Sequence, residues 1–564
     1  MRLVHRVGWL ALLAPNALAA QMALPLKHAP QPTVPAITAA DLMTRLYIYA
    51  DDSMMGRRAG TPWNLKATAY VAAEAQRMGL VPAGDSGTFF QNVPLVKETI
   101  DSTSTITAGG TTLRVFDDFL PRHFGAGEPR SVDGAQAIFG GSLNAADSFP
   151  VEQARGRVVV FSLPAGPLRI NPGAVIARLN EAAGLAFPGL ERVPPQFKHF
   201  LREPSVTLAP SGGDQRGGPT ILQLTSAAAG ALLGTPLDSA RVGATGATLR
   251  AHVTVTRESA PARNVVAVVR GSDPRPRGEY VAIGAHNDHI GLTLPPVDHD
   301  SMRIFNQVVR PEGAEQTGKQ ATPAEQDRVD SLLAAWRTAH PGTQRADSID
   351  NGADDDGSGT VSVLEIAQRI ATERVKPKRS IIFVWHTGEE LGLFGSTWFT
   401  DHPTVPRDSI VAQLNIDMIG RGDSADETGR TKEGAPIHGN PNYLQLVGSR
   451  RLSTELGDLV EKVNTEDHHG LAFDYSLDAD GHPQNIYCRS DHYSYARYGI
   501  PVVFFTTGGH ADYHQVTDEP EYIDYPHMAR VANLVEDVAM HVADLDHRVV
   551  VDHPKPDPQG ACRQ

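Results

Sequence analysis

Five short apolar runs in the second half of the chain predict buried strands. They are "NVVAVV" from Asn264, "EYVAIGA" from Glu279, "SIIFVW" from Ser380, "VAQLNI" from Val411 and "PVVFFT" from Pro501. Near-continuous apolar strands that alternate with helices are typical of a parallel sheet covered on both faces. We therefore expect an α/β fold with a mixed, largely parallel sheet sandwiched by helices. Ligands of such folds bind beyond the carboxyl ends of the strands.

Helical spacing marks segments between and around these strands. Residues 358–371 form one predicted helix, and another begins at Pro526. In the second helix the apolar residues recur every three or four positions. They are Met528, Val531, Val535, Val538, Val542 and Leu545.

The amino-terminal part carries two helix-start signals. Thr38, with Asp41 three residues later, is a capping signal. Thr61-Pro62 begins a further helix that we expect to stop at Gly79.

Two stretches interrupt the strand and helix pattern. Between residues 108 and 257, short β-like runs alternate with Gly and Pro turns, and no catalytic constellation stands out. We expect an inserted β-rich domain there.

Residues 293–350 are polar and long for a loop, with a candidate helix at 324–340. Because long loops inside compact domains are usually functional or disordered, we interpret this insertion as a flap or rim near the ligand site.

The length of 564 residues predicts more than one domain. The first residues have the charged start, apolar stretch and small-residue cleavage motif of a secretory signal; the alternative is a buried first helix. We therefore expect an exported protein, periplasmic or extracellular. The expected order is a signal at 1–19, a linker at 20–37, a main domain at 38–107 and 258–546 that is divided by the insertion at 108–257, and a tail at 547–564.

Charge and cysteine content narrow the functional classes. The net charge is −14 and no long basic run occurs, which argues against a nucleic-acid partner. No later segment approaches the ~20 apolar residues of a membrane span, so we expect no membrane anchor. The two cysteines, Cys488 and Cys562, can form one disulfide in an exported protein or remain unpaired thiols. Both readings stay open, as does the oligomeric state.

Acidic and histidine residues stand at the edges of the apolar runs. They are His286, Asp288, Asp355, Glu389, Glu390, Asp417 and His514. Two imidazoles and several carboxylates match what a pair of zinc ions needs, with one carboxylate left over as a base. Five segments of this kind, most of them at strand ends, predict a metal-dependent hydrolase.

Each residue also has a simpler reading. In "DDD", Asp354 or Asp356 can replace Asp355 as a ligand, and the whole run can be a solvated turn. Glu389 and Glu390 can be a charge pair at a helix start. His492 and His510 compete with His514, and they are better read as supports of the pocket. The H-x-D spacing favours a joint role for His286 and Asp288, because it puts them on one side of an extended chain.

Six sequence blocks, in order, resemble one enzyme family. They are "GAHNDHIG", "NGADDDGSGT", "GEELGLFGS", "NIDMIGR", "RSDHYSYARYGIPVVFFTTG" and "YHQVTDEP", and "GRRAGTPWNLKATAYVAAEAQRMGL" near the amino terminus fits the same pattern. Together they resemble the secreted di-zinc aminopeptidases, a family that includes bacterial leucyl aminopeptidases and glutamate carboxypeptidases. The insertion at 108–257 resembles a protease-associated domain.

The resemblance implies two Zn²⁺ ions per subunit and a role for each residue. It implies that His286 and Asp417 bind one zinc, that Glu390 and His514 bind the other, and that Asp355 bridges both. Glu389 is then the general base. Asp288 is the carboxylate that orients His286, and Tyr513 is a donor to the oxyanion. Only the family pattern Gly-x-x-Asp, counted from Gly352, selects Asp355 within "DDD". The metal used in the cell stays open, because such sites also take cobalt or manganese.

The implied function is removal of an N-terminal residue from peptide substrates. One alternative is a carboxypeptidase or dipeptidase, which needs a basic pocket; Arg421, Arg489 and Arg497 are the candidates. A glutaminyl cyclase-like reaction fits less well, because both metal sites look complete. The alternative from another class is a binding protein on this fold, which the complete ligand set disfavours.

Overall fold

The computed structural model describes residues 25–122, 129–164, 172–193, 201–209, 217–342, 344–558, 560 and 562–564. The signal expected at 1–19 lies outside these residues. In the part of the chain that is described, no helix is long and apolar enough to cross a membrane.

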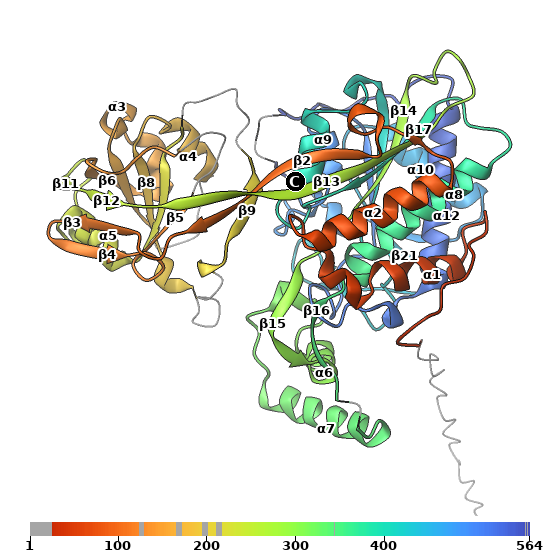
Figure 1. Cartoon of the computed structure of the whole chain (residues 1–564), viewed down its shortest axis with the longest axis horizontal. Coiled ribbons are helices and arrows are strands. Elements are labelled where there is room, and N and C mark those ends of the chain that lie inside the picture. Colours follow the sequence, from red (N-terminus) through yellow and green to blue (C-terminus); the bar gives the residue numbers. More distant parts are fainter. Residues whose placement is uncertain are drawn as a thin grey trace, which may run out of the picture.

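A ten-stranded sheet forms the centre of the main domain (Figure 1). Its order is β22-β21-β23-β18-β14-β17-β13-β2-β9, with β1 paired to β13. The four central strands are β23 (Val502–Thr506), β18 (Ile410–Ile416), β14 (Tyr280–His286) and β17 (Ser380–His386), and they run parallel. The outer strands are β1 (Val81–Pro82), β2 (Phe90–Ile100), β9 (Ser205–Leu208), β13 (Val255–Val269), β21 (Tyr443–Val447) and β22 (Ala472–Asp474).

The outer pairings are antiparallel, apart from β21 with β22. The expectation of a mixed, largely parallel α/β sheet is thereby confirmed.

Side chains alternate between the two faces along each strand, so both faces of this sheet carry apolar residues, and helices cover both. In β13, Val265 and Ala267 join one apolar core and Val266 and Val268 join the other. The first core includes residues of α1 (Ala39–Tyr49), α2 (Pro62–Arg77), α8 (Gly359–Thr372), α10 (Thr454–Glu466) and α12 (Tyr525–Asp544). The second includes residues of α9 (Phe394–Asp401) and α11 (His492–Ala496).

The amino-terminal helices begin where the capping signals predict. The Thr38 hydroxyl accepts a hydrogen bond from the Asp41 amide, and Thr61 caps α2 in the same way. The Asp41 carboxylate accepts from the Val34 amide at 3.0 Å, so it ties the preceding chain to α1.

The chain leaves and re-enters the main domain through one long ribbon. Strands β2 and β13 pair antiparallel from Val265 opposite Phe90 to Val255 opposite Ile100. The described residues of 101–254, called here the inserted lobe, lie beyond the far end of this ribbon, except that β9 returns to pair with β2 (Figure 1). This range starts and ends a few residues before the 108–257 expected, because β2 ends at Ile100 and β13 begins at Val255. The likeness to a protease-associated domain stays a prediction.

The inserted lobe has its own sheets and cores. A six-stranded sheet has the order β11-β6-β7-β8-β10-β5, and a three-stranded sheet has the order β12-β3-β4. The strands are β3 (Thr105–Ala108), β4 (Thr111–Arg114), β5 (Phe119–Arg122), β6 (Gln136–Ser142), β7 (Val158–Ser162), β8 (Gly184–Pro188), β10 (Thr220–Leu224), β11 (Thr245–Thr248) and β12 (Arg250–His252). The helices are α3 (Val151–Ala154), α4 (Pro172–Arg178) and α5 (Ser226–Leu233).

The polar insertion after β14 folds into a hairpin with two helices. Strand β15 (Gly291–Asp298) pairs with β16 (Ala346–Asp350), and between them lie α6 (His299–Val309) and α7 (Pro323–Ala339). The candidate helix at 324–340 is thus α7, which carries a capping box at its start and extends away from the main domain (Figure 1). A further hairpin, β19 (Glu427–Arg430) with β20 (Pro436–His438), follows β18.

A buried arginine joins three helices of the main domain. Arg45 of α1 pairs with Glu365 of α8 and with Glu74 of α2, and both Arg45 and Glu365 are about 1% exposed. Its guanidinium also donates to the Gln368 side chain at 2.8 Å. A buried charge without its partner is costly, so these helices depend on the pair being intact.

We predict that Arg45→Gln lowers the free energy of unfolding by about 3–5 kcal/mol, because it leaves Glu365 buried without its cation. The double variant Arg45→Met/Glu365→Leu removes both charges and recovers most of that loss. Denaturant unfolding of the three proteins measures this, and an equal loss in the single and double variants contradicts the account.

Candidate metal centre

The predicted site residues meet at the carboxyl edge of the parallel strands. His286 is the last residue of β14, Asp417 follows β18, and Glu389 and Glu390 follow β17 by three and four residues. Asp355 lies in the turn before α8, and His514 lies in the loop after β23. The parallel strands therefore bring together residues that are more than 200 positions apart.

The Asp355 carboxylate lies between two groups of donors. Its Oδ1 is 3.0 Å from His286 Nε2, and its Oδ2 is 2.9 Å from His514 Nε2. On the first side, His286 Nε2 is 3.7 Å from Asp417 Oδ1; on the second, His514 Nε2 is 3.0 Å from Glu390 Oε2. One carboxylate thus presents one oxygen to each group.

These donor sets fit two divalent cations. Ligand atoms of a tetrahedral zinc ion, about 2.0–2.2 Å from the metal, lie about 3.3 Å apart, close to the separations in both groups. His286 Nε2 is buried and has no hydrogen-bond partner among the described residues. Five carboxylates and three histidines are gathered here, and bound cations would offset this excess of negative charge. The carboxylates are Asp288, Asp355, Glu389, Glu390 and Asp417, and the histidines are His286, His289 and His514.

The sequence reasoning missed His289. Its Nδ1 is 2.7 Å from Glu390 Oε1 and 4.0 Å from Asp355 Oδ2, so it belongs to the second group of potential ligands. The ring packs against Gly352, where a Cβ atom would lie 2.5 Å from it. Its position three residues after His286 was the available signal, but H-x-x-H is not by itself a specific metal pattern.

The neighbours of Asp355 point elsewhere. Asp354 accepts from the Gly420 amide at 2.6 Å and lies 3.2 Å from His510 Nε2. Asp356 accepts from the amides of His286 and Gly359. Both carboxylates therefore organise the backbone around the site, and only Asp355 lies between the two donor groups.

Asp288 approaches His286 mainly through its backbone. The carbonyl of Asp288 is 3.1 Å from His286 Nδ1, whereas its carboxylate oxygen is 3.8 Å from that atom. The same carboxylate accepts from the Glu389 amide at 3.1 Å. Asp288 thus connects the loop of the first histidine to the loop of the predicted base, and its carboxylate role toward His286 stays a prediction.

Glu389 is a buried acid beside the first donor group. Its Oε2 is 4.0 Å from His286 Nε2. Burial raises the pKa of Glu389 well above its usual range, with the charges of Glu390 and Asp417 adding to the effect and that of His286 opposing it. A carboxyl group with a raised pKa can take up a proton near neutral pH and give it back.

A chain of buried polar groups orients Asp417. Ser490 Oγ donates to Asp417 Oδ2 at 2.6 Å and accepts from Asn415 Nδ2 at 2.9 Å. Gln413 in turn donates to Asn415 at 3.1 Å. These groups leave Oδ1 of Asp417 facing His286.

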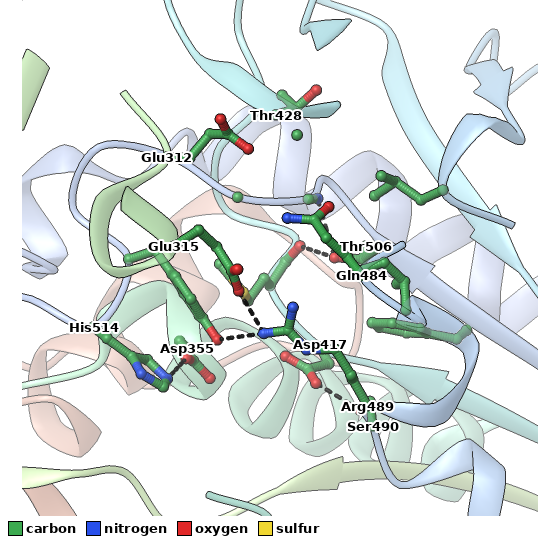
Figure 2. Close-up of a pocket in the computed structure, with 18 of the residues that line it drawn as sticks. Glu312, Glu315, Asp355, Asp417, Thr428, Gln484, Arg489, Ser490, Thr506 and His514 are labelled. Atoms are coloured by element: carbon green, nitrogen blue, oxygen red, sulfur yellow. Dashed lines mark hydrogen bonds and ion pairs between the residues drawn. The ribbon is translucent and has the colours of Figure 1, made fainter. Parts of the chain in front are cut away.

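A pocket opens beside the two donor groups (Figure 2). Its described lining combines apolar side chains, glycine backbone and acids: Glu312, Glu315, Asp355, Glu389, Glu390, Asp417, Met418, Thr428, Gly429, Leu477, Gln484, Ile486, Arg489, Ser490, Phe504, Thr506, Gly508, Gly509, Tyr513 and His514. Glu312 and Glu315 come from the insertion between β15 and β16. That insertion therefore reaches the pocket, as a rim would.

The three arginine candidates have different positions. Arg489 lines the pocket, where it pairs with Glu315 at 2.6 Å and donates to the Tyr513 hydroxyl at 3.4 Å (Figure 2). Arg421 is buried on Asp512, at 2.8 Å, and Arg497 pairs with Asp401; neither lines the pocket.

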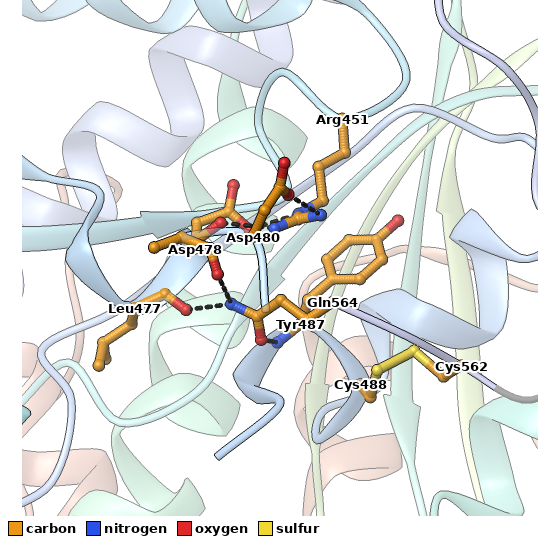
Figure 3. Close-up of a disulfide and its surroundings, with 9 residues drawn as sticks. Arg451, Leu477, Asp478, Asp480, Tyr487, Cys488, Cys562 and Gln564 are labelled. Atoms are coloured by element: carbon orange, nitrogen blue, oxygen red, sulfur yellow. Dashed lines mark hydrogen bonds and ion pairs between the residues drawn. A yellow bond between two sulfur atoms is a disulfide. The ribbon is translucent and has the colours of Figure 1, made fainter. Parts of the chain in front are cut away.

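A disulfide supports the wall that carries Arg489 and Ser490. Cys488 is bonded to Cys562, with their Cα atoms 5.9 Å apart, which settles the question left open by the sequence (Figure 3). The carboxyl-terminal Gln564 accepts from the Tyr487 amide at 2.9 Å and donates to the carbonyls of Leu477 and Ala479. The tail thus fastens the segment that forms this side of the pocket.

The sequence model of peptidase family M28 matches residues 264–539, which include every predicted metal ligand. That segment, just under half of the chain, is thus similar to peptidase family M28. Leupeptin-inactivating enzyme 1 of Streptomyces exfoliatus is 28% identical over 191 residues, 32% of this chain and 36% of that protein. Leucine aminopeptidase 1 of Coccidioides posadasii (strain C735) is 31% identical over 201 residues, 34% and 47% of the two chains.

The chain spans less than half the length of these two relatives. Among solved structures, an aminopeptidase from Aneurinibacillus sp. strain AM-1 is 16% identical, and the comparison covers 92% of this chain and 97% of that one with a TM-score of 0.49.

We predict that Cys562→Ser lowers the free energy of unfolding by about 2–4 kcal/mol, because the disulfide closes a long loop in the unfolded chain. The two cysteines are 74 positions apart. Denaturant unfolding with and without a reducing agent measures the effect. The reducing agent is expected to destabilise the parent protein and leave the variant unchanged; a variant as stable as the oxidised parent contradicts the prediction.

Because His492 is buried, we predict that the free energy of unfolding falls in acid. Burial lowers its pKa to about 3, so it stays neutral in the fold and takes up a proton near pH 6.5 once unfolded. Its contribution is therefore present above pH 6.5 and is lost as the pH falls from 6.5 toward 3, by about 1.4 kcal/mol per pH unit.

His492→Phe, which keeps a ring against Phe504, is expected to lose about 2 kcal/mol less unfolding free energy than the parent between pH 7 and 5. Chemical unfolding of the metal-free proteins measures the difference, with the exposed His438→Gln as control. Parallel pH curves for parent and His492→Phe contradict the assignment.

Proposed function

We propose that the chain is an exported, zinc-dependent aminopeptidase. The observation that carries this proposal is the Asp355 carboxylate, which turns one oxygen to each of two histidine and carboxylate groups, with the buried Glu389 beside them. The match of residues 264–539 to peptidase family M28 supports the same conclusion. Export is supported by the charged and apolar first residues and by a disulfide, which persists in oxidising compartments.

We assign the metal ligands from the two groups. His286 and Asp417 would hold one zinc ion, Glu390 and His514 the other, and Asp355 would bridge them, with His289 next to the second. When bound, two such ions polarise a scissile carbonyl and lower the pKa of water.

The remaining steps belong to the protein side chains. Glu389 accepts a proton from the attacking water and passes it to the departing amine, so that the C–N bond breaks without a free amide anion. Tyr513 donates its hydroxyl proton in a hydrogen bond to the carbonyl oxygen as negative charge develops there. Arg489, which is itself paired with Glu315, donates a hydrogen bond to that hydroxyl at the rim.

The charge of the pocket favours an amino terminus over a carboxylate. Six carboxylates line it against one arginine, and two divalent ions would neutralise four of the six. Arg489, the one basic candidate that lines the pocket, is already paired with Glu315. Met418, Leu477, Ile486 and Phe504 give the adjoining space an apolar character that suits an uncharged side chain.

The second candidate function is a carboxypeptidase or dipeptidase. Arg489 at the pocket wall is the observation that favours it, because a guanidinium can grip a terminal carboxylate in two places.

The test compares leucine amide, N-acetyl-leucine amide and N-acetyl-alanyl-leucine. We predict that the parent protein cleaves only the free-amine substrate. A chelator should abolish this activity and added zinc should restore it. Glu389→Gln should lower kcat by at least a hundredfold while keeping two bound metals per chain, because it removes the base and keeps the ligands.

Three outcomes separate the candidates in this experiment. Release of leucine from the blocked dipeptide moves the assignment to a carboxypeptidase. Full activity of Glu389→Gln overturns the role of that base. No turnover by a protein that carries two zinc ions per chain overturns the proposed peptidase function.

A further inference from the structure

A second cavity, of about 710 Å³, lies between the inserted lobe and the main domain. The lobe contributes Pro121, Arg122 and Arg130 among others, the ribbon contributes Glu98 and Arg257, and β9 contributes Ser205, Val206 and Thr207. Leu391 and Phe394 close it on the side of the main domain. None of these residues belongs to the pocket described above.

The cavity and the candidate metal centre share one loop. Leu391 follows directly after Glu390 and two residues after Glu389. Since consecutive Cα atoms are 3.8 Å apart, the Cα atoms of Leu391 and Glu389 lie within about 8 Å of each other. A ligand in the cavity therefore rests against the loop that carries the base and a metal ligand.

The charged lining of the cavity is basic in an acidic protein. Three arginines face it against one acid, although the whole chain has a net charge of −14. Arg257 pairs with Glu98 at 2.7 Å, and Arg130 donates to the backbone carbonyl of Ala182 at 3.0 Å. Arg122 differs from both, because no described residue provides it with a hydrogen bond or ion pair.

The guanidinium of Arg122, which has no partner among the described residues, can bind an anion. It is half-buried at the end of β5, and burial lowers its pKa, with Glu98 the one nearby charge that opposes this. Desolvating a cation without a partner is unfavourable, and a carboxylate offers a guanidinium two parallel hydrogen bonds. Val132, Val206 and Phe394 beside it add apolar surface for the rest of a ligand.

We propose that this cavity is a subsite for the carboxylate-bearing distal part of a peptide substrate, with Arg122 as its anchor. This rests on the proposed function, because the peptide would have its amino end at the metal centre. The inserted lobe then selects longer peptides with acidic distal residues, and short substrates do not use it.

The kinetic test uses leucine amide and two hexapeptides that begin with leucine and end in two glutamates or two glutamines. The parent should cleave the acidic hexapeptide with at least fivefold higher kcat/KM than the neutral one, and salt should reduce this preference. Arg122→Gln should remove the preference through KM and leave leucine amide unchanged. Arg250→Gln, an exposed arginine of the same lobe, is the matched control and should behave like the parent.

Two results overturn the subsite. One is an equal kcat/KM of the parent protein for both hexapeptides. The other is a decrease in kcat/KM of Arg122→Gln that has the same size for all three substrates. A thermal unfolding curve for each variant separates loss of fold from loss of the subsite.

Binding distinguishes failure of the subsite from failure of the proposed function. Calorimetry of the acidic hexapeptide with zinc-loaded Glu389→Gln, alone and combined with Arg122→Gln or Arg250→Gln, needs no turnover. We expect the Arg122 substitution to weaken binding at least fivefold and the Arg250 substitution to have no effect. Equal binding by all three proteins would overturn the proposal that this cavity is a peptide subsite, whether or not the parent hydrolyses leucine amide.

Discussion

The concentration of negative charge around Asp355 is the constraint on which the rest of the active region depends. Five carboxylates are gathered with three histidines in a largely buried group, and bound cations would offset their mutual repulsion. The sheet serves this need by ending its parallel strands at one edge. Asp354, Asp356 and Ser490 then hold the backbone and the Asp417 side chain so that each oxygen of Asp355 faces a different group.

Two additions to the main domain determine which groups lie near that charge. The insertion between β15 and β16 delivers Glu312 and Glu315 to the pocket, and Glu315 neutralises Arg489 there. The inserted lobe faces the other side of the loop that carries Glu389. The same short loop therefore separates two spaces of different chemistry, one acidic and apolar, the other basic.

Much of this arrangement could be predicted from the sequence, because strong local patterns coincide with it. Near-continuous apolar strands identified the central sheet, and their last residues identified most of the donors. Long-range packing limited the rest. No local signal separates Asp355 from Asp354 and Asp356, since only their contacts with Gly420, His510 and His286 distinguish them. His289 was missed for the same reason, and the disulfide depended on a Cα separation that only the fold defines.

The ribbon of β2 and β13 makes the inserted lobe a separable module of the protein. Because the lobe leaves and returns through two neighbouring strands, its acquisition or loss needs no change in the order of the sheet. Only β9 would go with it, and β9 is the outermost strand, so its departure would expose one edge of β2 and nothing deeper. Removal of the lobe would therefore leave the strands that carry the candidate metal ligands in place.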